Sequence, residues 1–218
     1  MVRLRVKKEL VQTMSTEPPF IEAIQLCRIL SAIQYNKVIY AMLVGQEDFN
    51  TSLQLNLVIN HAAVLYEGIK KFNALNKMLE KLESYKKNRE VIERISSEEN
   101  NLFGEVIYNI RKKVAFHFDK HVISRALGKF VADCIRENED IIFIEGKTNL
   151  VKDMRFLLAD NLNLRYVLSL IKGSGLSHEE KFRILAGELL KLSKLFCGIL
   201  EEIIPEMVED YCELVEQE

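Results

Sequence analysis

NIRKKVAFHFDK, residues 109 to 120, places an arginine and a histidine six positions apart in a run with helical apolar spacing. At 3.6 residues per turn, the apolar residues here share one face, with Arg111 at one edge and His117 at the other. Those apolar residues are Phe103, Val106, Ile107, Ile110, Val114 and Phe118. Six residues turn a helix by about 120°, so the two side chains of one copy point apart. A second copy of the helix could bring them together.

The sequence on either side of this stretch repeats the helical period, which predicts an all-α helical bundle. The predicted segments cover about 20–45, 53–82, 102–118, 123–138 and 157–171. A polar stretch near 96–101 predicts an interruption before the segment with the Arg–His pair. The composition agrees with a helical protein, since the chain has no tryptophan, nine glycines and three prolines.

The last part of the chain predicts one long helix. The glycines at 173 and 175 stop the preceding segment, and Ser177 with Glu180 has the spacing of a capping box. From there the apolar pattern extends toward Tyr211, with a bend expected at Pro205.

Two short runs are the candidates for β structure. VRLRV, residues 2 to 6, predicts either a short edge strand or a basic arm, and Ile141–Ile144 predicts one short strand or a buried connector. No internal repeat or linker divides the chain. We therefore predict a single helical domain over 1–218, with an N-terminal arm (1–19), a helical core (20–172) and a C-terminal helix (176–218).

The composition also limits where the protein works. A hydrophobic content of 48% in 218 residues suffices for a core without disulfides. The four cysteines lack CxxC pairing and fall mostly on apolar helical positions, which favours reduced thiols and a cytoplasmic location. No run approaches the roughly 18 apolar residues of a membrane-spanning helix, so no membrane partner is expected.

The charge is unevenly distributed along the chain. A net charge of −2 excludes a uniformly basic coat for nucleic acid. Residues 105–133 nevertheless hold six basic and three acidic side chains, whereas residues 201–218 hold eight acidic and no basic ones. Positive charge therefore gathers around the Arg–His pair. The acidic tail is interpreted as a solvated helix face, with masking of the basic region as the alternative.

The Arg–His stretch resembles the R-x(4 to 6)-H signature of HEPN domains. The words around it, IRKKVAFHFD, IIFIEG and FLLADNL, are similar to the abortive-infection subgroup of that family. The resemblance covers about residues 20–170. It implies a HEPN-like helical bundle and a metal-independent endoribonuclease that acts as a homodimer, with Arg111 and His117 of both copies lining a shared cleft. It also implies a toxin of prokaryotic defence or of a toxin–antitoxin pair, with an antitoxin protein as a possible partner.

The chemistry of RNA cleavage suits these residue types. With a pKa ordinarily near 6.5, His117 can accept the proton of the 2′-hydroxyl and donate one to the leaving oxygen. Arg111 can stabilise the charge on the phosphate, and Lys112, Lys113 and Lys120 are predicted to hold neighbouring phosphates of the RNA. No cofactor and no metal enter this scheme.

Two alternatives compete with this interpretation. Lys112 stands where HEPN members often have Asn or Asp, which favours a non-catalytic HEPN-like dimer that binds RNA or protein. His117 and His121, four residues apart around Asp119, have the spacing of a shared zinc. The HExxH glutamate and a nearby third ligand are missing from the sequence, so no metal site is predicted. His61 is interpreted as a capped or satisfied bundle histidine rather than a ligand.

Overall fold

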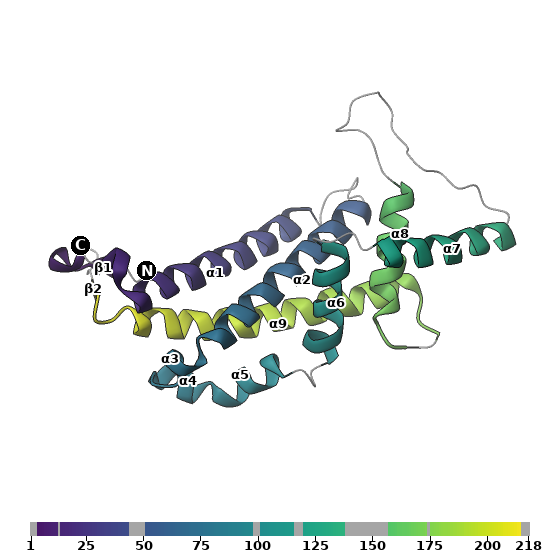
Figure 1. The fold of residues 1–218 in the computed structure, drawn as a ribbon. Helices are drawn as coiled ribbons and strands as arrows, with labels where there is room; N and C mark the ends of the chain where they lie inside the picture. Colours follow the sequence, from purple (N-terminus) through teal and green to yellow (C-terminus); the bar gives the residue numbers. More distant parts are fainter. Residues whose placement is uncertain are drawn as a thin grey trace, which may run out of the picture.

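Three long helices run side by side along the protein: α1 (Pro18–Leu43), α2 (Thr51–Ala74) and α9 (His178–Met207) (Figure 1). The computed structural model describes residues 4–12, 14–43, 51–97, 101–115, 120–137, 157–173 and 175–214. Within these ranges some side chains are not described, including those of 40–43, 51–53 and 120–123. The fold is all-α with a long C-terminal helix, as predicted.

The core lies where the three long helices meet. Leu26 of α1, Phe72 of α2 and Phe196 of α9 have no exposed surface, and the two phenylalanine rings meet edge to face with centroids 5.8 Å apart. Gly68 makes this approach possible, because a Cβ atom there would lie 2.6 Å from Cγ2 of Ile29. The absence of a side chain at one position of α2 therefore sets how closely α1 and α9 pack on it.

The start of α9 is fixed locally. The hydroxyl of Ser177 accepts a hydrogen bond from the backbone N–H of Glu180, whose carboxylate accepts one from the N–H of Ser177. The predicted capping box is confirmed. The helix contains Pro205 but ends at Met207, before Tyr211. The predicted 176–218 helix is therefore too long, because the chain turns back after Met207 to pair as a strand.

Three short helices follow α2: α3 (Asn76–Leu79), α4 (Glu83–Lys87) and α5 (Arg89–Ser96). α3 contacts α2, while α4 and α5 pack on α9. The prediction of one helix from 53 to about 82 is wrong in its length, since α2 ends at Ala74. Glu206 of α9 explains part of the difference. Its carboxylate accepts the backbone N–H groups of Glu83 and Ser84, and so stabilises a new helix start at α4.

The segment with Arg111 forms three consecutive helical pieces: η3 (Asn101–Ile107), α6 (Tyr108–Ile110) and η4 (Arg111–Ala115). η3 and η4 are π-helical, with hydrogen bonds over five residues, rather than the regular α-helix that the 3.6-residue period predicts. The predicted apolar face is nevertheless buried, against α2, at the positions whose side chains are described. Those positions are Val106, Ile107, Ile110 and Val114.

Helices α7 (Lys120–Glu137) and α8 (Leu157–Ser169) pack together at the end of the protein away from the termini (Figure 1). Phe130 and Cys134 of α7 form a small core with Leu162 of α8. Helical apolar spacing in the predicted 123–138 segment would place Leu127 and Ile135 on the buried face as well, but these two residues are 36% and 74% exposed. The stretch Ile141–Ile144, predicted as a strand or connector, lies outside the described residues.

The two ends of the chain meet in a small antiparallel sheet. Strand β1 (Leu4–Val6) pairs with β2 (Cys212–Leu214) in the register Arg5 to Glu213. This confirms the strand alternative for the N-terminal arm, which continues through the short 3₁₀ helices η1 (Lys8–Leu10) and η2 (Met14–Thr16). Among the described residues, no helix is sufficiently long and apolar to cross a membrane.

Candidate functional site

Arg111 is the first residue of η4, and its side chain lies at the edge of the buried apolar face, at the surface of α2. Its Nε donates a hydrogen bond to Oε1 of Glu67, 2.5 Å away, and its guanidinium lies 5.9 Å from the centroid of the Tyr66 ring. The side chains of Arg111 and Glu67 are 29% and 44% exposed. Residues 66 and 67 of α2 therefore hold the guanidinium at the edge of the core, within reach of a ligand at the surface.

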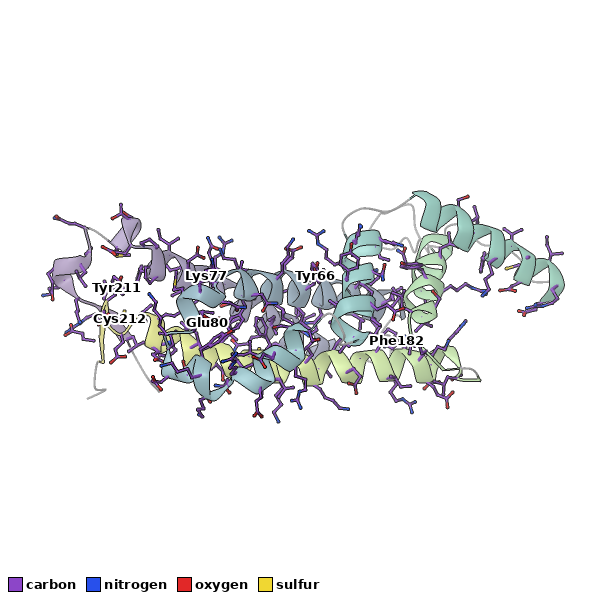
Figure 2. All side chains as sticks on the ribbon, turned by 60° about the horizontal axis from the view of Figure 1, so that its bottom comes forward. Tyr66, Lys77, Glu80, Phe182, Tyr211 and Cys212 are labelled. Atoms are coloured by element: carbon purple, nitrogen blue, oxygen red, sulfur yellow. The ribbon has the colours of Figure 1, made fainter. Side chains whose placement is uncertain are left out.

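Two tyrosines and a lysine surround this arginine. Tyr66 lies on α2 beside the α6 segment (Figure 2), and its ring centroid is 5.8 Å from that of Tyr108, with the rings tilted by 55°. Lys112 donates a hydrogen bond from Nζ to the hydroxyl of Tyr108 at 2.9 Å, and the same Nζ lies 5.2 Å from the Tyr108 ring centroid. We call Tyr66, Glu67, Tyr108, Arg111 and Lys112 the Arg111 cluster.

The electrostatics of the Arg111 cluster favour negative charge. The hydrogen bond from Lys112 lowers the pKa of Tyr108, burial opposes this effect, and the charges of Lys112, Lys113 and Arg111 add to it. Cations beside half-exposed aromatic rings are the combination that binds single-stranded nucleic acid, because phosphates meet the cations and bases stack on the rings. Glu67 is the one carboxylate within the cluster, and it forms an ion pair with Arg111.

The structure tests only part of the predicted site. Arg111 and Lys112 come together with the two tyrosines, and Lys113 follows them, half-buried on η4. His117 and the side chain of Lys120 lie outside the described residues. The geometry of the Arg111–His117 pair and the shared cleft of two copies therefore stay predictions.

The zinc alternative also falls outside what is described. Among the described residues no three side chains of His, Cys, Asp and Glu come together as a metal site would require. His117, Asp119 and the side chain of His121 are not among those residues. The geometry of a His117–His121 pair is thus untested.

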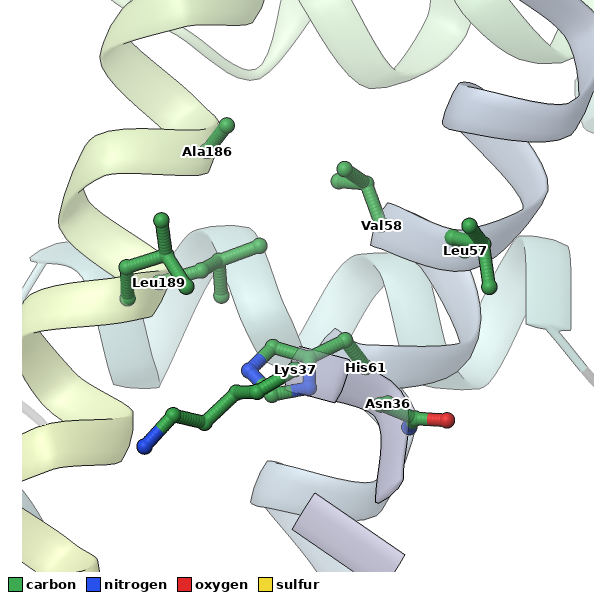
Figure 3. Close-up of a pocket in the computed structure, with 8 residues that line it drawn as sticks. Asn36, Lys37, Leu57, Val58, His61, Ala186 and Leu189 are labelled. Carbon is green, nitrogen blue, oxygen red and sulfur yellow. The ribbon is translucent and has the colours of Figure 1, made fainter. Parts of the chain in front are cut away.

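A second polar group lies inside the bundle, at the pocket between α1, α2 and α9 shown in Figure 3. His61 is buried, and its Nε2 lies 2.5 Å from Oγ of Ser193. Oγ of Ser193 also lies 2.7 Å from the carbonyl oxygen of Leu189, and when its proton is donated there, Nε2 of His61 is the donor in the contact with Ser193. The prediction of a satisfied bundle histidine holds for Nε2 alone, because Nδ1 has no hydrogen-bond partner among the described residues.

The surroundings of His61 keep it neutral. Burial, together with the charge of Lys37 beside it, lowers the pKa of His61 from 6.5 to about 4. Asn36 lines the same pocket and its Nδ2 also lacks a partner among the described residues. The cavity volume is about 30 Å³, which is room for a few water molecules and far too little for a nucleotide. A cavity of this size fits a role in packing rather than in binding a nucleotide, so the Arg111 cluster is the better functional candidate.

Sequence reasoning missed three members of the Arg111 cluster: Tyr66, Glu67 and Tyr108. Tyr108 and Lys112 are four residues apart, a spacing that predicts contact on a helix, so this contact was predictable from the sequence. Glu67 is 44 residues before Arg111, and the only signal for it is a carboxylate directly after the apolar run of α2. To predict a partner so far away in the sequence, one must know how η4 packs on α2.

Comparison with known proteins adds no relative. No protein-family model matches the chain, and no significant match is found among curated proteins or solved structures. The functional argument therefore rests on the residues and their geometry.

Proposed function

We propose that this protein is a metal-independent endoribonuclease of the HEPN type, with Arg111 and His117 as the catalytic residues. The observation that carries the proposal is the Arg111 cluster, in which a half-exposed guanidinium lies beside two tyrosine rings and a lysine. This set of side chains suits a phosphate together with its adjoining base. A role as a toxin in prokaryotic defence or in a toxin–antitoxin pair, with an antitoxin protein as partner, belongs to the same proposal.

In the proposed reaction the 2′-hydroxyl of RNA attacks the adjacent phosphorus atom and the bond to the 5′-oxygen breaks. His117 accepts the proton of the hydroxyl and returns a proton to the leaving oxygen. Arg111 stabilises the negative charge that builds up on the phosphate oxygens. The products are a 2′,3′-cyclic phosphate and a 5′-hydroxyl, and the balance of atoms requires no metal and no oxidant.

The remaining basic residues and the rings then hold the strand. Lys112, Lys113 and Lys120 would neutralise neighbouring phosphates, while Tyr66 and Tyr108 would stack against bases. Because the HEPN resemblance implies an active cleft that needs both copies, we further propose a homodimer in which the Arg111–His117 segment of both copies lies at or beside the interface.

A substitution of Glu67 tests whether Arg111 binds RNA phosphate. A phosphate would compete with this carboxylate for the guanidinium, so Glu67 lowers the attraction of the cluster for RNA. Glu67→Gln removes the charge but keeps an amide oxygen that can accept the hydrogen bond from Nε of Arg111. We expect this variant to bind single-stranded RNA several-fold more tightly at low salt in fluorescence anisotropy.

The matched control is Glu22→Gln, which neutralises a carboxylate paired with Lys71 between α1 and α2. Its affinity for RNA should equal that of the wild type. Equal affinities for the wild type and both variants would show that no RNA phosphate approaches Arg111.

A second candidate function is a non-catalytic HEPN-like dimer that binds RNA or protein. The ion pair between Glu67 and Arg111 favours it, since a compensated arginine is suited to a structural role. Lys112 in place of the small polar residue of the family favours it as well.

One experiment separates the two candidates: purified protein is incubated with RNA in EDTA, beside Arg111→Ala, His117→Ala and Arg165→Ala. Arg165 is a matched control, because it pairs with Asp133 at 2.6 Å, lies 4.8 Å from the Phe130 ring centroid and is 27% exposed. The nuclease proposal requires cleavage by the wild type and Arg165→Ala, and about 10²-fold or greater loss in the other two variants. RNA binding without cleavage would establish the non-catalytic function instead.

A further inference from the structure

Helix α1 is apolar on its outer side as well as on the side that faces the core. Ile21, Ile24, Tyr35 and Val38 are 37%, 46%, 66% and 53% exposed on a helix of 26 residues. Large apolar side chains that gather on one exposed face commonly mark an interaction surface. In the described structure α1 packs on α2 and α9 only with its inner face, which leaves the outer face uncovered.

The outer face follows a heptad pattern. Six of its exposed positions have the heptad spacing, and we call them the α1 seam: Ile21, Ile24, Arg28, Ser31, Tyr35 and Val38. Gln25, Cys27 and Gln34 are exposed beside this seam. The steps between the six seam positions alternate between three and four residues, which is the spacing of the a and d positions in a coiled coil. The other two charged residues of α1 lie elsewhere, because Glu22 pairs with Lys71 of α2 and Lys37 lines the pocket beside His61. The α1 seam is therefore apolar at both ends and polar in its middle.

The positions of the α1 seam are also spaced symmetrically along the helix. The six positions are symmetric about the midpoint between residues 29 and 30. Two antiparallel copies would thus place Ile21 against Val38 of the second copy and Ile24 against Tyr35, each an a-to-d contact. Arg28 would face Ser31 at the centre. A two-fold interface requires such a self-complementary surface, whereas an unrelated partner does not.

We propose that the α1 seam is a homodimer interface, in which α1 of two copies pairs antiparallel about a two-fold axis. Arg28 selects this arrangement over the others. A parallel pair would place Arg28 against Arg28, and a shift of the antiparallel pair by one heptad would bury Arg28 against Ile24 or Val38. Only the symmetric register gives every apolar residue an apolar partner and Arg28 a hydroxyl.

This interface is separate from the Arg111 cluster. α1 packs on α2 and α9, while the Arg111 segment packs on α2 at the front of the view in Figure 1. In that view α1 is the uppermost of the three long helices, and most of its length lies to the left of α6. The α1 pairing therefore holds whether or not the protein cleaves RNA, and a copy that used both faces would belong to an assembly larger than a dimer.

The test is analytical ultracentrifugation of the full chain at about 5 to 100 µM, beside circular dichroism to verify folding. The wild type should dimerise, and Ile24→Glu should shift the dissociation constant upward by about 10-fold or more, since it buries a charge in an apolar layer. The control is Ile135→Glu, which changes an even more exposed isoleucine on α7 and should leave dimerisation unchanged.

Ser31→Glu tests the register. In the antiparallel pair the new carboxylate faces Arg28 of the second copy, so dimerisation should become tighter and more sensitive to salt. In a parallel pair the same change would set the new carboxylates of the two copies against each other and weaken association. A monomeric wild type at 100 µM, a folded Ile24→Glu variant that dimerises like the wild type, or weaker association of Ser31→Glu would each overturn the proposal.

Discussion

The buried histidine of the bundle should make the protein lose stability as the pH falls from 7 to 5. In the folded protein His61 has a pKa of about 4, whereas an exposed histidine in the unfolded chain has its ordinary value of 6.5. Between these values the unfolded chain binds the proton and the folded protein does not. The stabilisation is therefore complete above pH 6.5 and is lost progressively as the pH falls toward 4.

The magnitude follows from the separation of the two pKa values. Their difference corresponds to about 3 kcal/mol when the pH has fallen below both, and to about 2 kcal/mol between pH 7 and pH 5. Urea unfolding at the two pH values measures it, with His61→Gln as the variant that removes the titrating group. The wild type should lose about 2 kcal/mol more than His61→Gln over this interval.

A control variant at another histidine completes the design. His178→Gln removes an exposed histidine at the start of α9, and it shows how much of any difference comes from the loss of a histidine as such. Equal losses for the wild type and His61→Gln would refute the argument that burial beside Lys37 and Ser193 keeps His61 neutral.

Two further predictions concern the packing of the bundle. Gly68→Ala should lower the free energy of unfolding by about 1 to 3 kcal/mol, because its Cβ would collide with Ile29, whereas Gly128→Ala on α7 meets nothing within 4 Å and should raise it by about 0.5 to 1 kcal/mol. Thermal melts of both variants decide this, and a shift in the same direction for both would contradict it. Burial raises the pKa of Glu206, but the hydrogen bonds from Ser84 and Glu83 outweigh it and hold the pKa below 4.5. Glu206→Ala should therefore cost about 1 kcal/mol at pH 7, and urea unfolding should show this deficit shrinking as the pH falls below 4.5, while a constant deficit would contradict the role of the charge.

The features that were predictable from the sequence are those written in contiguous residues. The helical period places α1 and α9, and the pair Ser177 and Glu180 marks the start of α9 because both members of a capping box lie within one turn. Four buried positions of the Arg111 segment follow from the same period, even though η3 and η4 are π-helical.

The features that were not predictable depend on residues far apart in the chain. The break after Ala74 lies among good helix formers, and the α4 start that follows it is stabilised by Glu206, more than 100 residues later. Strand β2 has three residues and exists through pairing with β1, as between Leu4 and Leu214. The contact of Glu67 with Arg111 is of the same kind. Local propensity does not contain such information.

The most direct test of the central claim is the chemistry of the RNA ends produced in EDTA. Wild-type protein is incubated with a defined single-stranded RNA and with DNA of the same sequence, and the products are identified by mass spectrometry. The account predicts fragments of the RNA alone, with 2′,3′-cyclic phosphate and 5′-hydroxyl ends, because the internal 2′-hydroxyl is the nucleophile and Arg111 and His117 replace a metal. Intact RNA, cleaved DNA, or RNA fragments with 5′-phosphate ends would contradict it.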